Sequence, residues 1–206
     1  MKRIMIFISI SVVISILGAA DLGEVIAKTN ATYANLNSFY TKFRQFMCDE
    51  AMGVCNIYDG EIYFLRPNFF KKTIEKPGQV LVGDSSSLWI YLPVEKRAIR
   101  QTLKDVPFAI NPNLFLAGYE ERFNAALTSD SAGTIGITLT PKEATEIFTR
   151  VVVTVDASSY VITAIAIVDQ AGAENKFYFE DTKLNPEINR KLFKFNPPKG
   201  TEIIEE

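Results

Sequence analysis

The feature of this sequence that most restricts its fold is a succession of short apolar segments separated by brief turn sequences. The segment TIGITLT places Ile135, Ile137 and Leu139 on one face and threonines on the other, which is the period-two pattern of a strand with one buried face. Turn sequences as short as PN, KPG and GDSSS favour antiparallel neighbours. Strands are therefore expected at residues 39–47, 56–66, 69–75, 79–83, 88–92, 97–103, 119–127, 134–140, 147–155, 161–168 and 176–181, with a last short strand in the tail.

A sheet of this size is not expected to stay flat, because strongly twisted open sheets of about ten strands or more curl or close. We therefore predict a mainly β protein of the α+β type, a strongly curved, incompletely closed antiparallel β-barrel of about 10–11 strands. An amphipathic helix over 21–37, which Asp21 can cap, and a short apolar helix or turn over 113–117 are expected to cover the concave apolar face. The 15 phenylalanines and 8 tyrosines suit a filled interior or a ligand cavity equally, so composition leaves that choice open.

The first twenty residues differ in kind from the rest of the chain. A positively charged start, MKR, precedes an almost unbroken apolar run that ends at Leu17, and small residues follow before Asp21. This composition predicts a cleavable secretory signal peptide over 1–20 and a single domain over 21–206. The alternative is a membrane anchor, but a run of about 14 residues is shorter than a span needs. No cysteine follows the run as a lipid-attachment site, so a soluble exported protein is expected.

The balance of charge argues against polyanionic partners. The whole chain carries 22 basic and 24 acidic side chains, and removal of the positively charged start would bring the net charge to about −4. No strong basic field would then attract nucleic acid or an anionic membrane surface. Nucleic-acid binding is therefore not expected.

The two cysteines, Cys48 and Cys55, flank the loop sequence DEAMGV. In an exported protein, two cysteines this close together predict a local disulfide. Closing such a short loop would stabilise the fold by roughly 2–3 kcal/mol. The alternative is a two-cysteine metal site, but the chain contains no histidine to complete one. No metal is expected.

The motifs that carry most enzyme chemistry are missing from this sequence. It contains no histidine, no G-x-S-x-G motif, no phosphate-binding glycine loop and no H-E-x-x-H motif. A secreted carbohydrate-active enzyme would need two carboxylates that face each other, whereas the neighbouring acids at 49–50 and 120–121 would point to opposite faces of a strand. The serines at 85–87 are interpreted as a hairpin turn. We expect neither an enzyme nor a cofactor.

Three stretches of the sequence carry a family resemblance. GEIYFLRPNFF at 60–70, VLVGDSSSLWIYLPVEK at 80–96 and FKFNPPKGTEI at 193–203, in this order, resemble the LolA family of periplasmic outer-membrane lipoprotein carriers. The resemblance covers nearly all of the chain after the signal peptide. Two positions depart from the family pattern: Ser85 stands where a glycine is usual, and Leu92 where an acidic residue or asparagine is common. These departures concern turn geometry more than the cavity.

The resemblance implies a function. A LolA-like protein is a periplasmic chaperone that binds the acyl chains of lipoproteins released by an inner-membrane ABC transporter and hands them to an outer-membrane receptor, where one exists. Its partners would be acylated lipoproteins, the transporter and the receptor, and it would act as a monomer without a cofactor. The alternative is a periplasmic lipid- or glycolipid-binding module, or a lipoprotein-sensing module, of the same fold.

The resemblance also implies site residues. The arginine of the family's arginine–proline pair corresponds to Arg66, which would donate hydrogen bonds to carbonyls of a lid over 114–117 and hold the empty cavity shut. An arginine suits this role because its planar fork offers several donors; from the residues alone, Arg66 would be a solvated strand end. Whether Tyr63 or Phe64 faces inward depends on strand parity, which stays open. The residues expected to line the lipid cavity or lid are Tyr63, Phe64, Phe70, Trp89, Leu114, Phe115 and Leu116.

Overall fold

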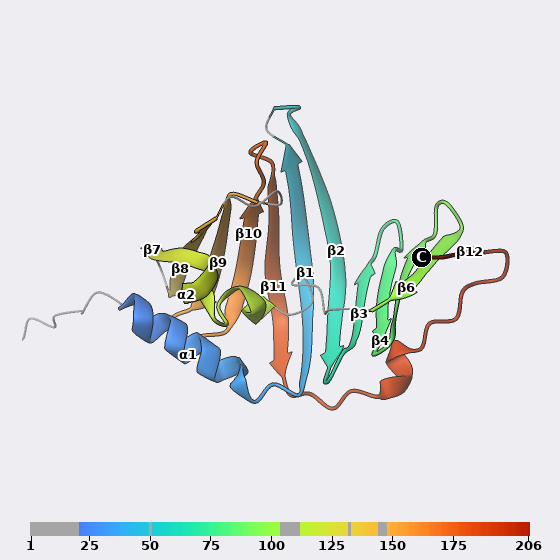
Figure 1. Cartoon of the computed structure of the whole chain (residues 1–206), viewed down its shortest axis with the longest axis horizontal. Coiled ribbons are helices and arrows are strands. Elements are labelled where there is room, and N and C mark those ends of the chain that lie inside the picture. Colours follow the sequence, from blue (N-terminus) through green and yellow to red (C-terminus); the bar gives the residue numbers. More distant parts are fainter. Residues whose placement is uncertain (1–20, 50, 104–111, 132, 144–147) are drawn as a thin grey trace, which may run out of the picture.

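The structure is a computed structural model that describes residues 21–49, 51–103, 112–131, 133–143 and 148–206, and its centre is one sheet of twelve strands (Figure 1). The predicted signal peptide lies outside the described residues. No helix of the described part is long and apolar enough to cross a membrane. The elements in chain order are α1 (Leu22–Ala34), β1 (Ser38–Asp49), β2 (Val54–Leu65), β3 (Phe69–Ile74), β4 (Val80–Asp84), β5 (Ser87–Leu92), β6 (Arg97–Thr102), the 3-10 helix η1 (Pro112–Phe115), α2 (Tyr119–Arg122), β7 (Phe123–Ser131), β8 (Thr134–Pro141), β9 (Arg150–Asp156), β10 (Ile162–Val168), β11 (Glu174–Leu184), the 3-10 helix η2 (Arg190–Phe193) and β12 (Glu202–Glu205).

The strands follow the order β12-β6-β5-β4-β3-β2-β1-β11-β10-β9-β8-β7. All pairs of neighbours except β12 and β6 are antiparallel. Strands β7 and β12 form the two edges and do not pair with each other, so the sheet curves without closing (Figure 1). This arrangement confirms the predicted fold class, an incompletely closed, curved barrel with helices.

Two details differ from what the sequence predicts. Strand β12 pairs with β6 in the parallel direction, because the long connection through η2 carries the chain from β11 to the far edge of the sheet. The strand expected from residue 119 begins at Phe123 instead. Gly118 adopts a left-handed conformation with φ of 60° and begins the short helix α2, which delays the strand.

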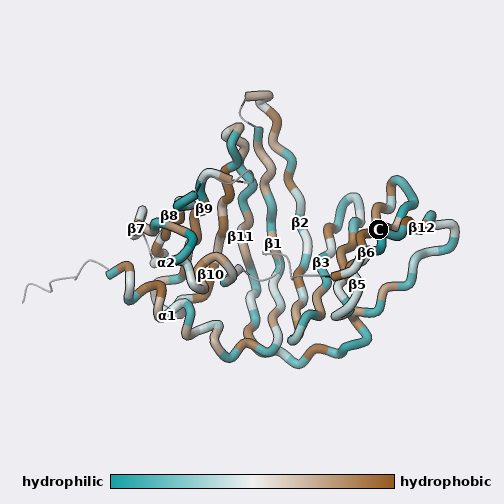
Figure 2. The backbone as a smooth tube through the Cα atoms, viewed as in Figure 1, coloured by the Kyte–Doolittle hydropathy of each residue, from teal (hydrophilic) through white to brown (hydrophobic). Residues whose placement is uncertain are grey.

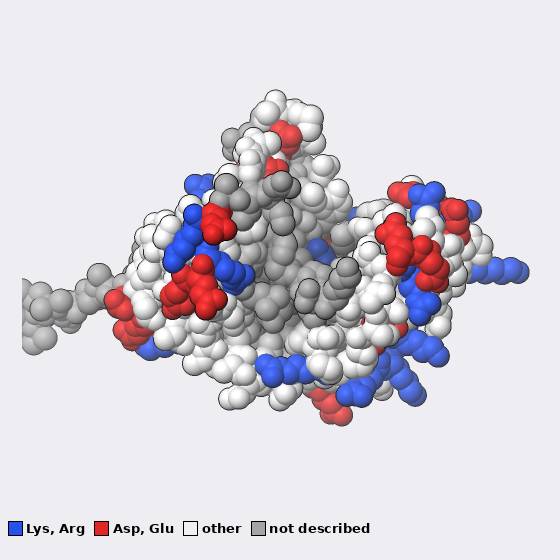
Figure 3. All heavy atoms as spheres, in the orientation of Figure 1, with Lys and Arg blue, Asp and Glu red and all other residues white. Residues whose placement is uncertain are grey.

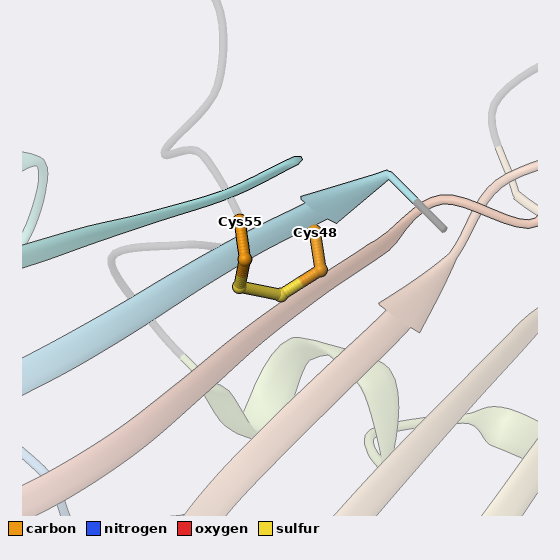
Figure 4. The surroundings of a disulfide bond; sticks show 2 residues. All are labelled: Cys48 and Cys55. Carbon is orange, nitrogen blue, oxygen red and sulfur yellow. A yellow bond between two sulfur atoms is a disulfide. The ribbon is translucent and has the colours of Figure 1, made fainter. Parts of the chain in front are cut away.

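The longest strands, β1 and β2, contain twelve residues each and form a hairpin in the middle of the sheet. Cys48 lies directly opposite Cys55 in this hairpin, and the two form the predicted disulfide (Figure 4). The bond closes the end of the hairpin next to its tip. Met52 and Val54 at the tip are exposed.

One face of the sheet, here called the inner face, is apolar across nearly all strands. Phe39 is paired with Phe64, and Phe64 with Phe70, so these three buried rings lie side by side on β1, β2 and β3. The tube in Figure 2 shows hydrophobic residues recurring along β9 and β10. The buried aliphatic residues of the inner face on β8, β9 and β10 include Ile135, Ile137, Leu139, Val151, Val153, Val155, Ile165 and Ile167.

Helix α1 packs against this inner face. The Asp21 Oδ1 accepts a hydrogen bond from the Glu24 backbone N–H at 2.9 Å, which caps the helix as predicted. At the other end of the helix, the Tyr33 hydroxyl accepts a hydrogen bond from the Ile162 backbone N–H at 3.0 Å. The helix is thereby fixed to the start of β10. Its buried stripe consists of Val25, Ile26, Thr29 and Tyr33.

The opposite face, here called the outer face, is covered in part by the C-terminal segment. Helix η2 contacts β3 and β4, and its Phe193 is buried with its ring 5.8 Å from that of Phe69. Farther along, the Phe195 ring lies 5.5 Å from Trp89 and 5.7 Å from Tyr91. The segment that follows β11 therefore closes the outer face over β3–β5.

We predict that loss of the disulfide weakens the fold without changing it. Replacing both Cys48 and Cys55 by serine should lower the free energy of unfolding by about 2–3 kcal/mol, because the unfolded chain regains the entropy of the closed loop. Urea unfolding of the parent with and without a reducing agent checks the result on the unmodified chain. Equal unfolding midpoints for the oxidised parent and the double variant would contradict this prediction.

Candidate functional site

The inner face is covered unevenly. Helices α1, η1 and α2 lie in front of the β7–β11 half of the sheet, and no described helix lies over the β3–β6 half on that side (Figure 1). Strand alternation places a second set of apolar side chains on this half, and they are only partly buried. A large apolar surface kept accessible in this way is typical of a binding site. The set comprises Ile74, Leu81, Leu88, Ile90 and Ile99.

Charged side chains gather around this surface (Figure 3), and Lys72 of β3 lies on it. In the space-filling view of Figure 3, acidic and basic side chains gather on the two sides of the molecule and along its lower edge. An apolar surface framed by charge suits an apolar ligand that is handled in water.

The inner face is covered in part by α1 and the segment 113–117, which are together called the cover. The segment 113–117 contributes apolar side chains to it. Phe115 and Leu116 are 4% and 0% exposed, and η1 contacts both α1 and β10. The Phe115 ring meets the Phe148 ring edge-on at 6.1 Å, and Phe148 in turn stacks on Phe123 at 6.2 Å. The expected short apolar helix is therefore present and lies between α1 and the sheet.

Two side chains hold the end of this segment through its carbonyl groups. Asn30 of α1 donates from Nδ2 to the Leu116 carbonyl oxygen at 3.4 Å. Arg122 of α2 donates from Nη2 to the Ala117 carbonyl oxygen at 2.9 Å. An arginine thus does bind a carbonyl of the predicted lid in this structure, but it is Arg122, which no sequence pattern singled out.

Arg66 lies beside the same segment, next to a hollow of about 440 Å³ between α1 and η1. Its backbone N–H donates to the Asn37 carbonyl oxygen at 2.8 Å, and its peptide bond to Pro67 is cis. Its guanidinium forms no hydrogen bond with any residue that the structure describes. Asn30 Oδ1, on the same hollow, is buried and has no hydrogen-bond partner among these residues. The residues around the hollow are Asn30, Tyr33, Ala34, Leu36, Phe64, Arg66, Asn113 and Ala117.

Strand register decides which of the other expected cavity residues lie together. Phe64 and Phe70 are paired on the inner face and are 6% and 0% exposed. Phe115 and Leu116 pack in the same core. Leu114 belongs to η1, but its side chain lies outside the described part of the chain. These four residues form one cluster, in which Phe115 and Leu116 of the cover pack with Phe64 and Phe70 of the sheet.

Tyr63 and Trp89 lie on the outer face, away from that cluster. Tyr63 precedes Phe64 in β2, and its hydroxyl donates to Glu61 Oε2 at 3.1 Å. Trp89 is paired with Val82 and packs on Phe195 of the C-terminal segment. Because successive side chains of a strand point to opposite faces, these two residues are not placed on the surface that carries Phe64, and we leave them out of the site.

The structure adds a polar cluster that the sequence did not reveal, formed by Lys72, Gln45 and Asn175 on the inner face. The Lys72 Nζ donates to Gln45 Oε1 at 3.3 Å, and Gln45 Nε2 donates to Asn175 Oδ1 at 2.9 Å. The same Nζ lies 4.8 Å from the ring centroids of both Phe43 and Phe177. The sequence signal that could have identified Lys72 is strand alternation. In FFKKTI, Lys72 is two residues from the buried Phe70 and therefore points to the same face as Phe70, not to that of Phe69.

Burial shifts the pKa of two groups, Lys72 on the inner face and Tyr33 of the helix that packs against it. Desolvation lowers the pKa of the Lys72 ammonium to about 8. Burial likewise raises the pKa of the Tyr33 hydroxyl to about 12, opposed by the hydrogen bond from the Ile162 backbone. Tyr33 therefore stays neutral at physiological pH, whereas Lys72 is a partly desolvated cation.

The described residues do not offer a metal site or a pair of catalytic carboxylates. No group of three or more metal-binding side chains occurs among them. Asp49 Oδ1 accepts from the Met52 backbone N–H in the hairpin tip, while Glu120 and Glu121 are exposed on α2. The serines at 85–87 form the expected turn, in which Asp84 Oδ1 accepts from the backbone N–H groups of residues 86 and 87.

Comparisons with known proteins give a consistent result. Residues 34–196 match the family model described as outer membrane lipoprotein carrier protein LolA. The outer-membrane lipoprotein carrier protein of Photobacterium profundum is 31% identical over 174 residues, 82% of each chain, and that of Nitrosospira multiformis is 26% identical over 178 residues, 84% of each chain. A solved structure of an uncharacterized conserved protein from Thermus thermophilus superposes with a TM-score of 0.57 at 10% identity, over 89% of this chain and 98% of that one. This last likeness concerns the fold alone.

The lowered pKa of Lys72 predicts a pH-dependent stability. Below about pH 8 the side chain is protonated in both the folded and the unfolded chain. Between about pH 8 and pH 10.5 the unfolded chain binds the proton more strongly than the folded chain. The folded state therefore gains stability as pH rises through this range. The free energy of unfolding of the parent should therefore increase over this window relative to that of Lys72→Met. Urea unfolding of both proteins across the window measures this difference. Parallel pH curves would show that Lys72 is not desolvated.

Proposed function

The chain belongs to the LolA family of outer membrane lipoprotein carrier proteins, and from this premise we propose that it is a periplasmic chaperone for lipoproteins. It takes up the acyl chains of lipoproteins that an inner-membrane ABC transporter releases, and it delivers them to an outer-membrane receptor. The proteins of this family are carriers and not enzymes.

The observation that carries this proposal is the partly covered apolar inner face. Its β3–β6 half presents branched aliphatic side chains that remain partly accessible, next to a core that α1 and η1 cover. Acyl chains are flexible and apolar, and they bind by burying surface rather than by specific hydrogen bonds. The inner face therefore supplies the type of surface that a carrier of acyl chains requires.

The size of the transfer problem explains why such a surface is needed. Each methylene of a lipid anchor moved into water costs about 0.8 kcal/mol, so three acyl chains of about 15 methylenes would cost on the order of 30 kcal/mol or more. Unassisted passage through water is therefore excluded. A carrier must shield these chains and must also cover its own surface when empty.

The cover over the inner face suits reversible opening. Phe115 and Leu116 attach it to the core through apolar contacts, and Asn30 and Arg122 donate hydrogen bonds to its carbonyl groups. Incoming acyl chains would replace apolar contacts with equivalent ones. Only the polar contacts would then differ between the closed and the loaded state.

Arg66 is placed to add such a polar contact. Its guanidinium has donors that no described residue uses, and Asn30 Oδ1 is a buried acceptor on the same hollow. We therefore assign Arg66 the role of a latch that binds Asn30 and carbonyls near η1 when the cover is fully closed. A charged hydrogen bond of this type stabilises by about 1.5–3 kcal/mol, which is small enough for lipid to displace.

Location in the periplasm is part of the proposal. A signal peptide over residues 1–20 would export the chain, and the Cys48–Cys55 disulfide suits an oxidising compartment. Cleavage before Asp21 would leave the N-cap of α1 at the start of the mature chain.

The ligand that accompanies the protein from its own compartment tests this function directly. The purified protein should carry lipoproteins whose modified N-terminus is released as diacylglyceryl-cysteine peptides, which mass spectrometry identifies. A free lipid or glycolipid in their place would instead support a lipid-binding module of the same fold and would contradict the carrier function.

Loss of the latch should affect release more than loading. In Arg66→Leu the closed state loses its polar contact while the loaded state does not, so we expect transfer of a bound lipoprotein to receptor-bearing membranes to slow by about tenfold or more. Arg97→Leu is the matched control, because Arg97 pairs with Glu95 and Glu202 at the sheet edge. Transfer by Arg66→Leu at the parent's rate would refute the latch.

A further inference from the structure

One cation interrupts the apolar inner face. Lys72 of β3 has its ammonium group between the rings of Phe43 and Phe177, at 4.8 Å from each centroid. Its one hydrogen bond to a described residue goes to the neutral amide of Gln45 at 3.3 Å. Among the described residues it forms no ion pair, although Lys42, Arg44 and other exposed basic side chains do.

Gln45 and Asn175 make this cation part of a fixed arrangement. Gln45 is 6% exposed, and its Nε2 donates to Asn175 Oδ1 at 2.9 Å, which leaves its Oε1 directed at Lys72. The hydrogen bond to Asn175 therefore fixes the orientation of the Gln45 amide, and this amide in turn orients the Lys72 ammonium. An ammonium has three donors, so the contact with Gln45 leaves others for a ligand.

The cluster connects two hollows on the inner face. Lys72 lines a hollow of about 140 Å³ together with Ile74, Gln79 and Leu81. Asn175, at the other end of the cluster, lines a second hollow of about 410 Å³ together with Met47, Ile167 and other residues. A ligand that extends along this face would pass the ammonium on its way from one hollow to the other.

A ligand made only of hydrocarbon would be penalised at this position. It would remove the remaining water from Lys72 and supply no acceptor, and an unpaired buried cation is costly. Burial already lowers the pKa of this ammonium, which shows that its hydration is incomplete. A ligand with an oxygen acceptor within hydrogen-bond distance of the Lys72 ammonium would remove the penalty.

We propose that Lys72, oriented by Gln45 and Asn175, binds the oxygen acceptor at the root of an acyl chain. The acceptor is a carbonyl oxygen, and two sources offer it: the ester and amide carbonyls of a lipoprotein's lipid anchor, or the carboxylate of a free fatty acid. The first source rests on the proposed function. In either case the cluster sets how deep the chain enters, so that the inner face distinguishes acylated ligands from plain hydrocarbon.

The test compares ligands that differ in this acceptor. The parent, Lys72→Met and the control Lys71→Met are titrated calorimetrically with a synthetic triacylated lipopeptide, with palmitate and with hexadecane, which has the same chain length as palmitate but no oxygen atom. Methionine keeps the length and the apolar stem of lysine. Lys71 is the neighbouring residue on the outer face.

Lys72→Met should bind the lipopeptide, palmitate or both about tenfold more weakly than the parent, and its affinity for hexadecane should not fall. Lys71→Met should match the parent. Loss for the lipopeptide assigns the cluster to the lipid anchor, and loss confined to palmitate assigns it to free fatty acids. Equal affinities of the parent and Lys72→Met for all three ligands would overturn the proposal.

The titration distinguishes a failure of the role of Lys72 from a failure of the carrier function. A parent that binds palmitate through Lys72 but does not bind the lipopeptide would overturn the carrier function alone. If Lys72→Met does not fold, the parent still gives the answer: NMR signals of its lysine side-chain ammonium groups should show one that shifts with palmitate or lipopeptide and not with hexadecane. No such difference would overturn the role of Lys72.

Discussion

Burial of the inner face of the twelve-stranded sheet is the interaction on which the rest of the structure depends. Each aliphatic or aromatic side chain removed from water there contributes about 1.5–3 kcal/mol, and the buried cluster runs from Phe70 on β3 to the residues of β8 and β9. A curved sheet that does not close has no second sheet to cover this face. Helix α1 and the segment 113–117 take that place over one half only, and the other half keeps its apolar side chains partly accessible.

The remaining parts of the molecule leave this face as the place for a ligand. The C-terminal segment occupies the outer face through Phe193 and Phe195. The disulfide joins β1 and β2 at the far end of their hairpin, away from the cover (Figure 1). In the proposed function, the cover and a bound acyl chain would compete for the same apolar surface, so polar contacts at the edge would decide the balance between them. Asn30 takes part in these contacts, since its Nδ2 binds the Leu116 carbonyl while its Oδ1 lies buried on the hollow next to Arg66.

Much of the architecture followed from sequence patterns, because period-two alternation and short turns constrain strands strongly. The capped helix at Asp21, the short apolar helix before Gly118 and the disulfide were all predicted and found. Two features were not predictable in this way. The parallel pairing of β12 depends on where a long connection ends, which local patterns do not determine. The face of each strand depends on register, so Tyr63 and Trp89 were grouped with Phe64 although they lie on the other face.

The site shows the same limit more sharply. Phe64, Phe70, Phe115 and Leu116, which the family resemblance implied as cavity or lid residues, lie in one apolar core, and their contact with a ligand stays a prediction. Lys72 was not among them, because a lysine on a short strand is usually a solvated residue. Its parity with Phe70 was the available signal, and its contacts with the rings of Phe43 and Phe177 show that it faces inward. The contact from Arg122 to Ala117 depends on the turn at Gly118, which no motif marked.

The most direct test of the central claim asks which face of the sheet touches acyl chains. A photo-reactive amino acid is introduced at Ile90, on the inner face of β5, or at the adjacent Tyr91, which packs on Phe195 on the outer face. Each protein is loaded with a lipoprotein whose acyl chains carry a label, and is then irradiated. A carrier that binds lipid on its inner face gives labelled adducts from position 90 and not from position 91. Adducts from position 91 alone, or from neither position while the lipoprotein stays bound, would contradict the account.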